Sequence, residues 1–105
     1  MNETASWATA CEWMGTLADL QGASAVLEWD RETIMPSGAA EARGAQLSTL
    51  AGLHHRALLD PSVGDALDQL LESGDPVRAA SAHEAQRERS RAERVPEALV
   101  RELTE

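Results

Sequence analysis

Three histidines and one cysteine are the side chains of this chain best suited to metal binding or nucleophilic chemistry. His83 and Glu84 open the pattern His-Glu-x-x-His. In that pattern two histidines one helical turn apart bind zinc, and the glutamate acts on the zinc-bound water. The place of the second histidine is taken by Arg87, whose guanidinium stays protonated and cannot bind a metal. We therefore interpret His83 as a surface residue on a charged helix.

The other two histidines and the cysteine also lack the partners that such chemistry needs. His54 and His55 are adjacent, so on a helix they point about 100° apart and do not converge on one ion. We expect one of them at the edge of the core and the other in water. Cys11 has no basic neighbour that would favour the thiolate, and we interpret it as a small core residue. No phosphate-binding glycine loop or nucleophile elbow is present.

The segment from Trp29 to Arg43 is richer in distinct chemical groups than a simple connection requires. Its candidate residues for a groove-lining or structural role are Trp29, Asp30, Glu32, Thr33 and Arg43. A purely structural interpretation is equally open: Trp29 could anchor the core, and Asp30 or Thr33 could cap a turn. In that interpretation Arg43 pairs with Glu32 or Glu41. Composition alone does not decide between the two.

Prolines and turn residues divide the chain into five helical segments. The first expected helix runs from Glu3 to about Trp29, and the second follows the turn Pro36-Ser37-Gly38, with Ser37 as its cap. Asp60-Pro61 begins a third helix that stops at Ser73-Gly74, and Asp75-Pro76 begins a fourth that runs to about Arg94. A fifth begins at Pro96. No β-branched or aromatic run alternates as a strand does. The prediction is an all-α fold, a small antiparallel bundle of four to five helices without a sheet, in one domain over residues 1–105.

Apolar residues recur at helical spacing along these segments. The stripes are Trp13, Leu17, Leu20, Ser24 and Leu27, with Trp7, Cys11 and Met14 adjoining; Leu47, Leu50, His54 and Leu58; and Val63, Leu67, Leu70 and Leu71. Gly15 and Gly22 mark places where another backbone could pack closely. The Arg-rich segment predicts pairs of Glu84 with Arg87 and of Arg89 with Glu93. Because the chain has no Phe or Tyr, we expect a thin core.

The charge of the chain excludes two classes of partner. The formal net charge is -9, and all nine basic residues are arginines. Such a field repels nucleic acid and anionic membrane surfaces. No apolar run reaches the roughly 20 residues that span a bilayer, and the acidic start does not resemble a signal peptide. With a single cysteine, these features predict a cytoplasmic protein.

From about Leu17 to Leu50 the chain resembles the N-terminal region of the carboxypeptidase Taq family of metallocarboxypeptidases. The resemblance rests on the order Trp-Asp-x-Glu-Thr-x-Met-Pro-x-Gly-Ala-Ala-Glu-Ala-Arg-x-x-Gln-Leu, which begins at Trp29. It continues more loosely to Arg94-Val95-Pro96. It implies a helical, cytoplasmic, usually dimeric enzyme, much longer than this chain, that removes C-terminal amino acids from peptides with zinc or cobalt.

The family's metal-binding His-Glu-x-x-His helix has no counterpart in these 105 residues. The resemblance therefore implies an N-terminal scaffold or groove wall that binds no metal itself and supplies no catalytic residue. The implied partners are the remainder of the peptidase chain, the peptide substrate of the whole enzyme and a second copy in a homodimer. A different class stays open: a stand-alone helical module that buries its apolar stripes by self-association.

Overall fold

The computed structural model describes residues 2–33 and 39–104, and these residues form five helices and no strand. The helices are α1 (Glu3–Thr33), α2 (Ala40–Leu58), α3 (Pro61–Leu71), α4 (Pro76–Glu93) and α5 (Glu97–Thr104). The all-α prediction is confirmed. The predicted Pro36-Ser37-Gly38 turn and the Ser37 cap lie outside the described residues. None of the helices described is long and apolar enough to cross a membrane.

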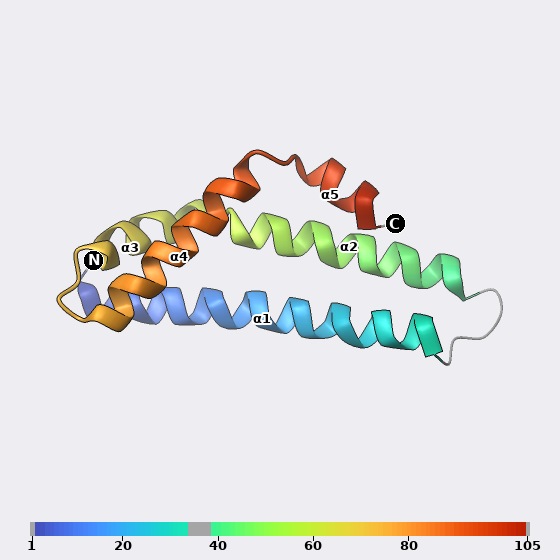
Figure 1. The fold of residues 1–105 in the computed structure, drawn as a ribbon, viewed down its shortest axis with the longest axis horizontal. Helices are drawn as coiled ribbons and strands as arrows, with labels where there is room; N and C mark the ends of the chain where they lie inside the picture. Colours follow the sequence, from blue (N-terminus) through green and yellow to red (C-terminus); the bar gives the residue numbers. More distant parts are fainter. Residues whose placement is uncertain (1, 34–38, 105) are drawn as a thin grey trace.

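The helices form a long hairpin with a cluster at one end (Figure 1). α1 and α2 run antiparallel along the long axis, and the molecule measures 54 × 25 × 18 Å. α3 and α4 gather at the end where α1 begins, and α5 folds back along α2 (Figure 1). The two ends of the hairpin are therefore covered unequally.

Two aspartate caps and the prolines that follow them begin α3 and α4, as predicted. The carboxylate of Asp60 accepts a hydrogen bond from the Ser62 backbone N–H at 3.0 Å, and Asp75 accepts one from Val77 at 2.9 Å. Each bond satisfies a donor that the helix start leaves free. The backbone hydrogen bond from Ser62 lowers the pKa of Asp60, so its carboxylate stays charged when it caps.

The core lies where α1, α2, α3 and α4 meet. Its buried members are Ala10, Trp13, Leu58, Val63, Leu67, Leu70, Ala82 and Ala85. The indole Nε1 of Trp13 donates a hydrogen bond to the carbonyl of Ala57 at 2.8 Å, which ties α1 to the end of α2. The interpretation of Cys11 as a core residue is wrong: its side chain is exposed. The buried line of α1 runs through Ser6, Ala10 and Trp13, and Cys11 lies beside it.

α5 packs against α2 at two small residues. The hydroxyl of Ser48 donates to the carbonyl of Arg101 at 3.0 Å. A Cβ at Gly52 would lie 2.9 Å from Cδ of Arg101, so a larger residue there would require the flexible Arg101 side chain to shift. The prediction that Gly15 and Gly22 mark close contacts is wrong. A Cβ at either would meet nothing within 4 Å, because both glycines lie on exposed faces of α1.

Of the two ion pairs predicted within α4, the structure contains one. Glu84 and Arg87 pair at 3.4 Å, as predicted. Arg89 does not pair with Glu93, which corrects the second prediction. Its Nη1 donates instead to the backbone carbonyls of Leu58 and Asp60, at 3.0 and 2.9 Å. α4 crosses the corner between α2 and α3 there, and the carbonyl of Leu58, at the C-terminal end of α2, needs a donor.

The two adjacent histidines of α2 differ in exposure. His55 is the buried one, with 8% of its surface exposed. His54, which the apolar stripe placed in the core, is half-buried at the side of α2 that faces α1 and α4. The two side chains point in different directions, as expected. His55 is the more buried of the two, and neither histidine is fully exposed to water.

Candidate functional site

The candidate residues lie at the far end of the hairpin, on the last turns of α1 and the first turn of α2. Nε of Arg43 donates to Oδ2 of Asp30 at 2.8 Å, and its Nη1 donates to Oε1 of Gln46 at 3.0 Å. Both ionic side chains are about one-third exposed, 29% for Arg43 and 31% for Asp30. The ion pair joins the two helices where the hairpin turns.

The predicted partners of Arg43 were wrong. Asp30 faces α2, whereas Glu32 lies two residues on, about 200° around α1. Glu41 likewise lies two residues from Arg43 and on another face of α2. The structure thus brings together Asp30 and Arg43 and leaves Glu32 exposed, with no ion-pair partner among the residues described.

Trp29 and Thr33 also differ from the structural interpretation. The Trp29 side chain is 59% exposed and anchors no core within the part of the chain that the structure describes. The hydroxyl of Thr33 donates to the carbonyl of Trp29 at 2.6 Å inside the helix, and within the described ranges it caps no turn. This end offers an indole and a carboxylate of Glu32 to solvent beside a fixed ion pair. Such groups can contact another polypeptide.

The fit of a zinc or cobalt ion can be tested on the side chains present. No three His, Cys, Asp or Glu side chains within residues 2–33 and 39–104 gather into a group that could hold a metal ion. His83 is exposed on α4, away from the two histidines of α2. The described residues therefore do not fit the metal site that the family resemblance implies for a whole enzyme.

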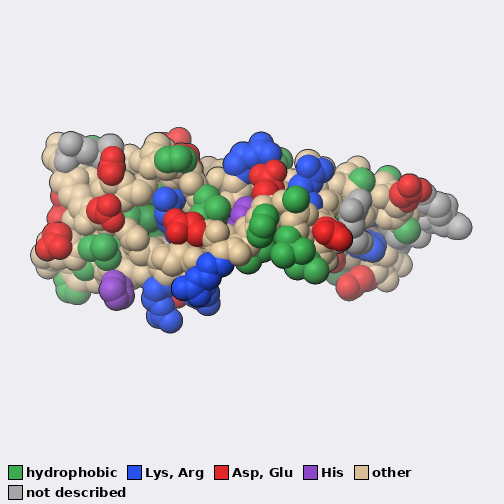
Figure 2. All heavy atoms as spheres, turned by 90° about the horizontal axis from the view of Figure 1, so that it is seen from above, with side chains coloured by type: hydrophobic (Ala, Val, Ile, Leu, Met, Phe, Trp, Pro, Cys, Tyr) green, Lys and Arg blue, Asp and Glu red, His purple; other side chains and the backbone are tan. Residues whose placement is uncertain are grey.

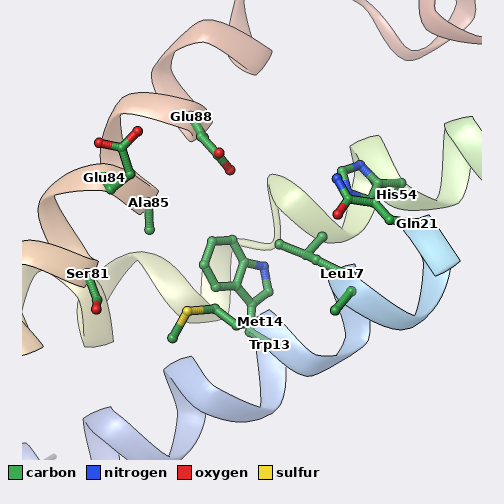
Figure 3. A pocket seen from close by; sticks show the side chains of 10 residues that line it. Trp13, Met14, Leu17, Gln21, His54, Ser81, Glu84, Ala85 and Glu88 are labelled. Carbon is green, nitrogen blue, oxygen red and sulfur yellow. The ribbon is translucent and has the colours of Figure 1, made fainter.

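One feature of the structure was not foreseen from the sequence. A cleft of about 390 Å³ opens between α1 and α4, with α2 at its back (Figure 3). It is lined by Trp13, Met14, Leu17, Ala18, Gln21, His54, Ser81, Glu84, Ala85 and Glu88. The sequence holds a partial signal, since Glu84 and Glu88 are one turn apart on α4. Their position opposite Trp13 depends on how α4 crosses α1, which no local pattern records.

Comparison with known proteins places the chain in a family. The model of the carboxypeptidase Taq (M32) metallopeptidases matches residues 10–105. Thermostable carboxypeptidase 1 of Thermus thermophilus is 30% identical over 110 residues, which cover 100% of this chain and 22% of that relative. The chain thus spans less than a quarter of the relative's length. No solved structure matches it. Because the family model covers nearly all of the sequence, this chain belongs to the carboxypeptidase Taq (M32) metallopeptidase family.

Proposed function

We propose that this chain is the N-terminal helical scaffold, or a wall of the substrate groove, of a metallocarboxypeptidase that removes C-terminal amino acids from peptides. The observation that carries the proposal is the family match over residues 10–105 in a chain whose described residues gather no metal ligands. The relative's much greater length supports it, because 78% of that protein has no counterpart in this alignment.

In this proposal the metal and the groups that handle protons belong to polypeptide outside these 105 residues. Zinc or cobalt would polarise the scissile carbonyl and activate a water when bound in the whole enzyme. The residues of this chain have a structural role in this proposal. The Asp30–Arg43 pair joins the end of α1 to the start of α2, and the exposed Trp29 and Glu32 contact the remainder of the peptidase chain or the peptide substrate.

The test compares the 105-residue chain with the longer polypeptide that its gene would encode. The chain alone, purified without chelator, should bind no stoichiometric zinc by elemental analysis and release no C-terminal amino acid from a blocked peptide. The longer polypeptide should do both. Turnover by the 105 residues alone that a point substitution in them abolishes would contradict the proposal, as would a native stop codon directly after Glu105.

A substitution in the longer polypeptide examines the role of Trp29. Trp29→Ala should lower kcat/KM about tenfold if the indole contacts the groove or its wall, since a buried aromatic contact contributes roughly that factor. Val77→Ala is the matched control, because Val77 is similarly exposed at 67% but lies at the opposite end of the hairpin. Equal kcat/KM values for the Trp29→Ala and Val77→Ala variants would show that Trp29 does not contact the groove or its wall.

A second candidate function, self-association of an independent helical module, is favoured by exposed apolar side chains. These include Val26, Trp29, Leu53, Leu99 and Leu103. Hydrophobic side chains gather near the middle of the upper face, where α5 lies (Figure 2). Sedimentation velocity over a range of concentrations measures the association, and Leu103→Glu should weaken it if α5 forms the interface. A dimer alone fits both candidates, so the downstream reading frame discriminates: a His-Glu-x-x-His pattern there favours the peptidase.

A further inference from the structure

The cleft between α1 and α4 has an apolar floor. α4 packs mainly on α3, and its middle turns stand away from α1 (Figure 1). Trp13, Met14 and Leu17 form the floor on the α1 side, and Ala85 faces them from α4 (Figure 3). The volume of about 390 Å³ lies at the lower end of the range for pockets that bind small ligands.

The polar groups of the cleft are negative or neutral. Glu84 and Glu88 come from α4, and the carboxylate of Glu88 hangs into the space between Trp13 and His54 (Figure 3). Glu88 makes no ion pair with any residue that the structure describes, whereas Glu84 shares Arg87 at the exposed edge. α1 contributes the neutral amide of Gln21.

His54 adds no positive charge to the cleft near neutral pH. Burial lowers the pKa of its imidazole, and this effect outweighs the opposing influence of Glu88. The neighbouring His55 also lowers the pKa of His54. The carboxylate of Glu88 therefore faces the apolar floor with no cation of the described chain beside it, while Glu84 pairs with Arg87 at the edge of the cleft (Figure 3).

We propose that the α1/α4 cleft binds a basic side chain, a guanidinium or ammonium group on an alkyl stem, presented by a polypeptide. The stem lies on Trp13 and Leu17, and the cation meets the carboxylate of Glu88, with Glu84 at the outer edge. Long basic side chains bury their methylene groups on apolar surface while the charged end stays with polar partners. A neutral apolar ligand would instead cover Glu88 without pairing it, which costs free energy.

The chain already contains the same combination of groups within its own fold. The guanidinium of Arg78 lies over the Trp7 ring, 5.3 Å from its centroid, and its Nη1 meets Oε2 of Glu3 at 2.9 Å. An indole together with a carboxylate therefore holds an arginine in this protein. The cleft repeats the indole and the carboxylate but has no arginine of the described chain between them. The net charge of -9 further favours the approach of a cation.

The experiment follows the indole N–H resonance of Trp13 by NMR in the 105-residue chain. Substitutions Trp7→Phe and Trp29→Phe assign it among the three tryptophans. Two probes are titrated: n-butylguanidinium, and a blocked Ala-Arg-Ala peptide that carries the same group on a polypeptide. Both should give saturable shifts. 1-Butanol lacks the charge and guanidinium ion lacks the stem, so neither should saturate at the same concentrations.

Variants locate the cation. Glu88→Gln should raise the Kd for both probes about tenfold, the usual scale of one lost charge-assisted hydrogen bond. Glu84→Gln should raise it about threefold, because Arg87 already shares that carboxylate. Glu93→Gln is the matched control: Glu93 is exposed on α4 as Glu88 is, but it does not line the cleft, so its substitution should leave the Kd unchanged.

Several results would overturn the proposal. Saturable binding of 1-butanol with equal affinity would mean an apolar pocket. An equal Kd for Glu88→Gln and Glu93→Gln would remove the carboxylate from the site, and binding of n-butylguanidinium without the peptide would exclude a polypeptide source. In the unaltered chain, affinity should fall as salt rises from about 20 to about 200 mM, and a Kd insensitive to salt would contradict a charged contact. The proposal rests on this chain's residues alone, so it stands or falls separately from the peptidase assignment.

Discussion

The two ends of the hairpin are built from the same kinds of residue but packed differently. At the end where α1 begins, four helices surround Leu67 and Leu70, which are 1% and 0% exposed. At the end where α1 meets α2, the apolar stripe continues through Leu20 and Leu27, yet both are only half-buried. On α2, which packs against both α1 and α5, Leu47 is 2% exposed, whereas Val26 and Trp29 of α1 remain exposed.

The contrast shows that a stripe alone does not make a core. A leucine becomes fully buried where neighbours cover it from several sides, and two antiparallel helices cannot provide that cover. Folding stability is therefore concentrated in the α3 and α4 end. The far end retains exposed apolar surface of the kind that contacts other polypeptides.

The largest expected effect is at the covered end. Leu70→Ala should reduce the free energy of unfolding by about 2–5 kcal/mol, because it removes a fully buried side chain and leaves a cavity. Leu103→Ala at the open end should change it by less than about 0.5 kcal/mol, since that side chain is 77% exposed. Urea denaturation followed by circular dichroism measures both, and equal losses would abolish the contrast between the ends.

A smaller effect is expected where α4 begins. Asp75→Ala removes the carboxylate that caps Val77 N–H and should cost about 1 kcal/mol of unfolding free energy. Asp65→Ala on α3 is the matched control, because Asp65 is exposed and makes no side-chain hydrogen bond among the residues described. Thermal unfolding compares them. A control that destabilises as much as the cap variant would show that charge, and not capping, matters at this end.

The smallest global effect belongs to α5. Arg56 donates two hydrogen bonds to Glu97, at 3.0 and 2.9 Å, and its hydrogen bond lowers the pKa of Glu97. A carboxyl whose pKa is lower in the folded state stabilises that state above its unfolded pKa and loses the contribution as pH falls through the folded value. The protection factors of the α5 amides, which compare the measured exchange rates with their intrinsic, pH-dependent values, should therefore fall between about pH 5 and about pH 3, while those of the core amides stay high.

Glu97→Gln sharpens the same measurement. It should quicken α5 exchange at neutral pH and remove most of the acid dependence, whereas Glu102→Gln, on the same helix with no ion-pair partner in the described chain, should do neither. Because Asp60 titrates in the same direction at the other end, the comparison must be made on α5 amides. Equal behaviour of the two variants would show that Ser48 and Gly52 alone hold α5 in place.

Local signals in the sequence predicted the helices well. Asp60-Pro61 and Asp75-Pro76 marked helix starts because a cap and a proline act within a few residues. Contacts between helices were predicted poorly. The exposure of Cys11 and the close approach at Gly52 follow from which face of a helix meets a neighbour, and spacing along one helix leaves that rotation undetermined.

The same difference between local signals and contacts between helices applies to the candidate site. The segment that holds Trp29 and Arg43 was singled out by its residue types and stays a prediction, but the partner of Arg43 was not predicted, since it depends on the register of α1 against α2. The cleft at Trp13 was missed altogether, because its two walls are about 70 residues apart in sequence and meet only through the crossing of α4.

The hydrogen bonds from Arg89 bear on how the chain assembles. Its guanidinium reaches from α4 to two carbonyls at the corner between α2 and α3. Until α4 docks, the Leu58 carbonyl lacks this donor and the Asp60 carbonyl accepts from the Val63 N–H, so a polypeptide ending after α3 would lack the side-chain hydrogen bonds that tie α4 to this bend. The corner is thus completed from a distance, by a residue synthesised about 30 positions later, and it should be among the last parts of the molecule to become rigid.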